Sequence, residues 1–467
     1  MHVPDRALRR LFAAFVLLWC ALTAAAQELP AEVDAALARA KLPRDAVAFY
    51  VAPADAPSAP RLVHRIDQPF NPASMAKLVT TYAALDTLGP NFSWATPVYF
   101  EGPVQGGVLQ GNLYIKGQGD PKLVIERMWL LLRRIHALGV RRVSGDIVLD
   151  RGAFENVATD PGAFDGEPLR PYNAAPDALL LNFKSVVLTF TPEAGGTRVQ
   201  VEPPLAGVQW PASVPLSNAP CGDWRAGLKA DYSDPARVRF TGSYPVACGE
   251  RVWPVAYADP ASYAVRAVGG LWRETGGELG GQVREGRVPA ALKPVFEWRS
   301  PPLAEVVRDI NKYSNNVMAE QVFLTLSFQK LGQGSMAASR DVLRAWWRER
   351  LGGEPPVLDN GSGLSRTERI TARQLAQVLH SAWGSSLMPE LMSSLPASGV
   401  DGTLRRAGNT GLAHLKTGSL RDVSGVAGYV HGASGRRYVL VAVANHANAA
   451  AVRPAIDAMV EWAARDR

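Results

Sequence analysis

Ser74-Met75-Ala76-Lys77 places a serine and a lysine one turn apart at the start of a predicted helix. Apolar residues continue on one helical face, and Gly89-Pro90 ends the helix. Because positions i and i+3 share a helix face, Lys77 is expected to reach the Ser74 hydroxyl. A serine needs a base to become a nucleophile, and a neutral lysine amine can serve. The stretch therefore predicts Ser74 as the nucleophile and Lys77 as its base.

Two conditions support this chemistry. Burial, together with the positive charge expected from Lys416, would lower the pKa of Lys77 and leave its amine free. The N-terminal end of the helix would help to hold an oxyanion through the Ser74 backbone N–H. The same serine and lysine spacing recurs at Ser327 and Lys330, inside a helical stretch with no start signal ahead of it, and no function is expected there.

Ser314-Asn315-Asn316 falls in a break between two predicted helices. Ser314 is expected to relay a proton to the leaving amine, and Asn316 to hold Lys77 and accept a hydrogen bond from the substrate amide. The structural alternative is that Ser314 only caps the following helix.

Lys416-Thr417-Gly418 lies on a predicted strand that enters a hairpin. Lys416 and Thr417 are expected to bind a substrate carboxylate, and Gly418 to let the substrate backbone pair along the strand edge. Ser419 would supply a second oxyanion N–H. An ordinary strand end is the alternative.

Arg366 ends the glycine-containing segment Asp359–Arg366. It is a candidate for binding a second carboxylate in bidentate fashion, and the alternative is a solvated surface arginine.

Other catalytic signatures are missing from the sequence. It has no G-x-S-x-G, no H-E-x-x-H and no zinc-ligand spacing, so neither a metal nor another cofactor is expected.

The composition agrees with an exported globular protein. The 467 residues suffice for two or three domains, and the formal net charge of +7 is scattered. Scattered charge argues against nucleic-acid binding, whereas a mildly basic chain suits an anionic polymer at the cell surface, although a generally basic proteome explains it equally well. Cys221 and Cys248 are expected to form one disulfide in an oxidising compartment, the alternative being two free thiols.

Residues 1–26 resemble a secretory signal peptide. Arginines at positions 6, 9 and 10 precede the apolar run 11–22, and Ala24-Ala25-Ala26 forms a cleavage site. A lipoprotein signal ending at Cys20 fits poorly, because the bulky Trp19 precedes that cysteine. An uncleaved anchor is the other alternative.

The order of predicted elements indicates a discontinuous α/β domain. Strands near residues 46–52, 61–66, 413–416, 425–431 and 437–445 surround a helical middle, so both ends of the chain are expected to share one sheet. Residues 27–91 and 301–467 would form this domain. Residues 92–300 carry mostly short strand-like runs, including 263–268, with one helix at 124–138. They predict an inserted, mostly β domain with a sub-lobe near 170–255.

The three motifs, their order and the large insert resemble the low-molecular-mass class C penicillin-binding proteins, which are D-alanyl-D-alanine carboxypeptidases and endopeptidases. Segments 117–121, 398–404 and 416–425 also look like family segments. The resemblance implies a serine β-lactamase/transpeptidase-like catalytic domain, peptidoglycan stem peptides as substrate, β-lactams as inhibitors and a periplasmic location. It assigns the roles given above to Ser74, Lys77, Ser314, Asn316, Lys416 and Thr417.

The resemblance further implies that Arg366 and an aspartate of the insert, here Asp165, grip the diaminopimelate side chain. A β-lactamase, a D-amino-acid esterase and a non-catalytic wall-binding protein are the alternatives. The oligomeric state, the protein partners and the balance between carboxypeptidase and endopeptidase activity do not follow from the sequence.

Overall fold

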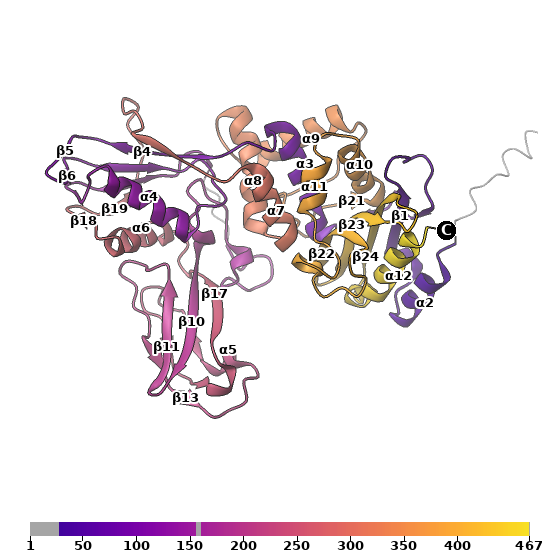
Figure 1. Cartoon of the computed structure of the whole chain (residues 1–467), viewed down its shortest axis with the longest axis horizontal. Coiled ribbons are helices and arrows are strands. Elements are labelled where there is room, and N and C mark those ends of the chain that lie inside the picture. The colour runs from indigo at the N-terminus through magenta and orange to yellow at the C-terminus, as the bar shows by residue number, and fades with distance from the viewer. Residues whose placement is uncertain (1–27, 156–159, 467) are drawn as a thin grey trace, which may run out of the picture.

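The computed structural model describes residues 28–155 and 160–466, so the expected signal peptide lies outside the described residues. Figure 1 shows two lobes, one of which contains both the first and the last elements of the chain. This lobe is built on a five-stranded antiparallel sheet in the order β2-β1-β24-β23-β22. Its strands are β1 (Val47–Pro53), β2 (Leu62–His64), β22 (Ala413–Leu420), β23 (Val423–His431) and β24 (Arg437–Asn445).

The pairing of β1 with β24 confirms that the two ends of the chain share one sheet. Successive side chains of a strand point to opposite faces, and β1 is buried on both faces. Val47, Phe49 and Val51 pack toward α2 (Ala31–Arg39) and α12 (Arg453–Ala464). Ala48, Tyr50 and Ala52 pack toward the helices on the other face. The lobe is therefore a helix–sheet–helix sandwich.

The larger helical layer holds the first two sequence motifs. It consists of α3 (Lys77–Leu88), α7 (Leu303–Tyr313), α8 (Asn316–Leu331), α9 (Met336–Arg350), α10 (Ala372–Trp383) and α11 (Met388–Ser394). Helix α3 is buried almost all round, which explains its largely apolar sequence. Thr371 caps α10: its side chain accepts from the Gln374 N–H and completes a capping box.

Residues 92–300 form separate sheets. The chain enters and leaves through paired strands, β4 (Ala95–Phe100) and β20 (Phe296–Arg299). They belong to the sheet β19-β9-β7-β4-β20, completed by β7 (Leu113–Lys116), β9 (Ile147–Asp150) and β19 (Val283–Glu285). A smaller sheet has the order β18-β8-β6-β5, with β5 (Val104–Gln105), β6 (Val108–Leu109), β8 (Arg142–Val143) and β18 (Glu278–Leu279). These sheets and their own apolar core are our basis for proposing that the segment is an inserted domain.

Three helices lie in the described part of this segment: α4 (Ile125–Ala137), the short α5 (Trp224–Gly227) and α6 (Tyr263–Glu274). The first was predicted, but the strand predicted at residues 263–268 is wrong, because these residues begin α6. Tyr263, Ala267, Val268 and Leu271 are buried at helical spacing. A six-residue apolar run is too short to separate the two periodicities, and the helical period emerges only when Leu271 is included.

A further group of strands projects from the rest (Figure 1). Its main sheet has the order β12-β11-β10-β17, formed by β10 (Ser185–Glu193), β11 (Gly196–Glu202), β12 (Ser213–Val214) and β17 (Arg251–Ala256). Two short strand pairs accompany it, β13 (Leu216–Ser217) with β16 (Tyr244–Pro245) and β14 (Ala230–Asp231) with β15 (Arg239–Phe240).

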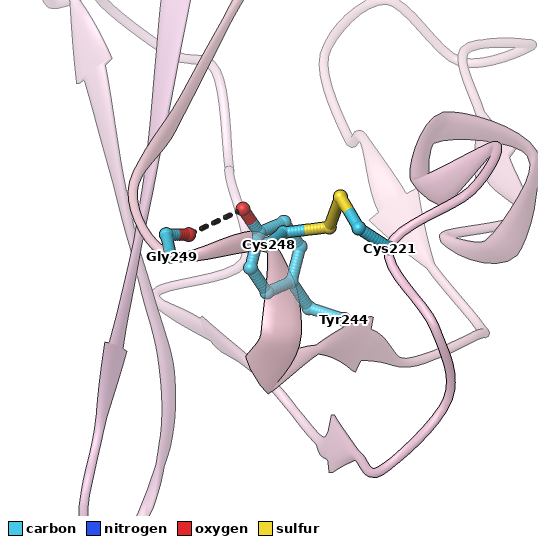
Figure 2. Close-up of a disulfide and its surroundings, with 4 residues drawn as sticks. All are labelled: Cys221, Tyr244, Cys248 and Gly249. Carbon is cyan, nitrogen blue, oxygen red and sulfur yellow. Dashed lines mark hydrogen bonds between the residues drawn. A yellow bond between two sulfur atoms is a disulfide. The ribbon is translucent and has the colours of Figure 1, made fainter.

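Cys221 and Cys248 form a disulfide in this projecting region, as expected from the sequence (Figure 2). Tyr244 lies beside the bridge and donates a hydrogen bond from its hydroxyl to the Gly249 carbonyl at 2.8 Å.

In the described part of the chain, no helix has the length and apolar character needed to cross a membrane.

Replacing both cysteines with serine should destabilise the projecting strands. The bridge closes a loop between positions 27 residues apart, and its loss is expected to lower the free energy of unfolding by about 3 kcal/mol in the chain-entropy model. Urea unfolding of wild-type and doubly substituted protein, followed by tryptophan fluorescence, measures this. Equal stability of the two proteins would contradict the prediction.

Candidate active site

Ser74 lies in a tight 3-10 turn, η2 (Ala73–Ala76), that leads directly into α3. Ala73 has a φ angle of 47°, a left-handed conformation that is unfavourable for alanine and costs about 1–3 kcal/mol. The Asn71 side chain holds this turn by accepting from the Ala73 N–H at 2.9 Å and donating to the Ser365 carbonyl at 2.9 Å. Strained backbone of this kind is concentrated at functional sites, and here the strained turn sets the orientation of Ser74.

The loop before Arg366 packs tightly under this turn. Gly363 has a φ angle of +79°, and a Cβ atom there would lie 2.0 Å from the Ala73 carbonyl oxygen. Thr80 of α3 donates to the Gly361 carbonyl at 2.7 Å. The glycines of this segment therefore serve close approach to the serine turn.

Lys77 is fully buried and lies at the centre of the site. Its Nζ is 2.9 Å from Ser74 Oγ and 2.7 Å from Asn316 Oδ1, and it also donates to the Ser362 carbonyl. The amide and carbonyl oxygens can only accept, so they occupy two N–H groups. In a neutral amine the remaining lone pair then faces the Ser74 hydroxyl, which is the geometry a base requires.

Burial lowers the pKa of Lys77 to about 7, and the nearby Glu320 and Glu368 carboxyls would raise that pKa only in their ionised forms. The direction agrees with the sequence expectation, but the role given to Lys416 in it does not. Lys416 is itself fully buried, and burial and the nearby Lys77 charge hold its pKa well below the ordinary lysine value. Desolvation is therefore the main cause of the lowered Lys77 pKa.

The second motif bridges two helices. Ser314 follows the last residue of α7 in the left-handed conformation, with φ 56°. Asn315, and not Ser314, caps α8 by accepting from the Met318 N–H at 3.0 Å. The Ser314 side chain is thus not used as a helix cap and accepts from Lys416 Nζ at 2.9 Å.

The third motif lies on β22, the outermost strand of the sheet. Lys416 also donates to the Thr417 carbonyl, and the Thr417 hydroxyl lies 2.8 Å from that of Thr403. A Cβ atom on Gly418 would lie 2.6 Å from the Pro72 carbonyl oxygen, so this glycine allows β22 to pack against the serine turn. The glycine therefore has a packing role besides the expected one in substrate pairing.

One pocket joins the three motifs. Its lining comprises Ser74, Ser314, Thr403, Thr417, Gly418, Ser419, Ser424, Gly425, Val426, Arg453 and Ile456. Ser419 is exposed and Ser74 is half-buried, so the pocket is open to a ligand. Stretches far apart in the sequence thus meet in one cleft, as the motif order predicted.

The two remaining candidates lie where the inserted segment meets the catalytic lobe. The Arg366 guanidinium is 4.6 Å from the centroid of the Phe164 ring, a cation–π distance, and Asp165 is the next residue. Asp165 accepts from the Tyr172 hydroxyl at 2.9 Å and from Asn173 Nδ2 at 2.8 Å. Desolvation raises the pKa of Asp165, but its hydrogen bonds, with Asn173 and Tyr172 foremost, together outweigh this and hold that pKa below its usual value.

Tyr172 also connects this loop to Lys77, because the Tyr172 carbonyl accepts from Asn316 Nδ2 at 3.2 Å, and Asn316 holds the lysine.

The sequence did not predict roles for Tyr172, Thr403, Ser362 and the buried pair Glu320 and Glu368. The only available signal was the position of Glu320, four residues after Asn316 on one helical face. The second serine–lysine copy is structural: Ser327 is buried in α8 and bonds to Ser339 at 2.7 Å.

Comparisons with known proteins agree with this geometry. The model of the D-Ala-D-Ala carboxypeptidase 3 (S13) family matches residues 29–466. The D-alanyl-D-alanine carboxypeptidase of Actinomadura sp. (strain R39) is 29% identical over 394 residues, which cover 78% of this chain and 71% of that protein. The D-alanyl-D-alanine carboxypeptidase DacB of Haemophilus influenzae is 25% identical over 390 residues, 80% of each chain.

Solved structures share the fold. Penicillin binding protein 4 (dacB) of Haemophilus influenzae aligns with a TM-score of 0.75 at 22% identity, over 92% of this chain and 99% of that chain. A penicillin G-acylated predatory endopeptidase of Bdellovibrio bacteriovorus aligns with a TM-score of 0.54 at 15% identity, over 90% and 93% of the two chains. With the family match across nearly the whole described chain, the protein belongs to the D-Ala-D-Ala carboxypeptidase 3 (S13) family.

Proposed function

We propose that this protein is a penicillin-binding serine peptidase that hydrolyses D-Ala-D-Ala and D-Ala–diaminopimelate bonds of peptidoglycan through an acyl-enzyme. The observation that carries the proposal is the placement of a fully buried lysine amine 2.9 Å from Ser74 Oγ, with two acceptors fixing its other N–H groups. Family membership supports the same reaction.

In the proposed reaction Lys77 takes the hydroxyl proton as Ser74 attacks the D-Ala carbonyl carbon. The oxyanion is held by the backbone N–H groups of Ser74 and Ser419. Lys416 and Ser314, in contact at 2.9 Å, deliver a proton to the leaving amine as the C–N bond breaks. Water then attacks the ester carbonyl and gives a proton to the now neutral Lys416. Lys77 returns its proton to the Ser74 oxygen as the ester C–O bond breaks, and the shortened peptide leaves as a carboxylic acid that ionises in water.

The proposed substrate contacts follow from the same geometry. The outer edge of β22 can pair with an extended peptide, and Lys416 and Thr417 would bind its terminal carboxylate. Arg366 and Asp165 would bind the carboxylate and the ammonium of a diaminopimelate side chain. Such a substrate requires an exported enzyme, and we propose that the protein acts in the periplasm.

Benzylpenicillin should form one covalent adduct with the wild-type protein and none with Ser74→Ala, because only the Ser74 oxygen can open the lactam ring. Intact-mass spectrometry measures this. A long-lived adduct, with D-Ala released from muropeptides, supports the peptidase, whereas rapid turnover of the adduct would favour a β-lactamase. Sacculus binding without an adduct would indicate a non-catalytic wall protein.

The rate of acylation should rise with pH through a midpoint near 7, because Lys77 acts only as the free amine and its pKa is about 7. Below that pH the protonated amine cannot accept the Ser74 proton. Stopped-flow measurements of acylation between pH 5.5 and pH 9 test this, the range being set around that midpoint. Lys77→Arg keeps a permanent charge and should lose about a hundredfold or more at every pH. Normal acylation by this variant would refute the base assignment.

Asp165→Asn and Arg366→Ala should each raise KM for a diaminopimelate-containing stem peptide by about tenfold or more, the value of a hydrogen bond to a charged group. Benzylpenicillin carries no such side chain, so its acylation rate should change little. Arg348→Ala, at an exposed position of α9, is the matched control. An unchanged KM in both variants would exclude these residues from side-chain recognition.

A further inference from the structure

A carboxylic acid pair lies beneath Lys77 and is not used in the proposed reaction. Glu320 projects from α8 one turn after Asn316, and Glu368 follows the loop that ends at Arg366. Both side chains are buried. Ser362 connects Glu320 to the lysine, because its carbonyl accepts from Lys77 Nζ while its hydroxyl lies 2.9 Å from Glu320 Oε1.

The hydrogen bonds around the Ser362 hydroxyl determine the protonation of Glu320. Asn360 Nδ2 donates to the Leu364 carbonyl, so Asn360 Oδ1 faces Ser362 and can only accept. The Ser362 Oγ lies 2.8 Å from this oxygen and 2.9 Å from Glu320 Oε1, but a hydroxyl has one proton. An ionised Glu320 would leave one of these oxygen pairs without a proton. A protonated Glu320 satisfies both, donating to Ser362 while Ser362 donates to Asn360.

The electrostatic surroundings agree. Burial raises the pKa of Glu320 to about 8, opposed by the Ser362 hydrogen bond and the Lys77 charge, and Asp359 and Glu368 raise it further. Burial likewise raises the pKa of Glu368 to about 7. Among the described residues, the charged or titratable groups facing this cluster are Lys77, Asp359 and the two glutamates. Arg340 is paired with Asp359 at 3.6 Å, and Lys416 lies beyond Lys77.

We propose that Glu320 is a positioning residue that stays protonated in the resting enzyme and anchors Ser362, so that the Ser362 carbonyl holds the Lys77 amine toward Ser74. A neutral acid at this place also adds no negative charge that would stabilise the lysine ammonium, so the amine remains available as a base. This role rests on the proposed function, in which Lys77 is the base.

Acylation by benzylpenicillin in Glu320→Ala, Ser362→Ala and Glu320→Gln tests the role. The two alanine variants should acylate about tenfold to a hundredfold more slowly, the loss expected when a catalytic group is displaced. Glu320→Gln keeps a neutral donor to Ser362, so it should restore the rate to within about threefold of wild type and keep the pH midpoint of the wild type. Glu349→Ala, exposed at the end of α9, is the matched control.

Three results would overturn the proposal: alanine variants at the wild-type rate, Glu320→Gln as slow as Glu320→Ala, or a pH midpoint that falls in Glu320→Gln. The last would mean that an ionised Glu320 had been raising the Lys77 pKa. If Glu320→Ala does not fold, Ser362→Ala takes its place in each comparison. Acylation of the wild type separates the two hypotheses, since a wild type without an adduct refutes the proposed function itself.

Discussion

The rest of this site depends on the desolvation of Lys77, whose amine is buried away from water. An ordinary lysine is charged at neutral pH and cannot accept a proton. Full burial brings its pKa to about 7, and carbonyl and amide oxygens from two separate segments replace the lost hydration. The free-energy cost of this burial must be met by packing, and α3 lies in the middle of the largest apolar core of the lobe.

This constraint explains why distant segments converge. The Asp359–Arg366 loop supplies the Ser362 carbonyl, and its Gly363 allows the approach to the serine turn. Helix α8 supplies Asn316 directly and Glu320 through Ser362. Strand β22 closes the other side, where Gly418 lets the sheet edge come close to Pro72. The polar groups therefore hold the Lys77 amine, and the glycines allow their segments to pack closely against the serine turn beside it.

The inserted segment is connected to the same centre. Asn316 bonds to Lys77 with its oxygen and to the Tyr172 carbonyl with its nitrogen, while the Tyr172 hydroxyl bonds to Asp165. Tyr172 thus links the proposed side-chain recognition residue, through its hydroxyl, and the amide that holds the proposed base, through its backbone carbonyl. The loop that would read the substrate also orients the amide that holds the lysine.

The sequence by itself determined the elements with strong local signals: the serine–lysine turn, the break at Ser314, the hairpin after Lys416 and the shared terminal sheet. Periodicity, capping and turn chemistry are local, so they can be read without coordinates. The helix at Tyr263–Glu274 was predicted as a strand, because its first six residues form too short a window to show the helical period. Only the tertiary structure decided that Glu320, Glu368 and Ser362 lie under Lys77, that Asn315 is the cap, and that burial is the main cause of the lowered lysine pKa. Desolvation and hydrogen-bond satisfaction depend on which distant groups surround an atom, and that information arises only when the chain has folded.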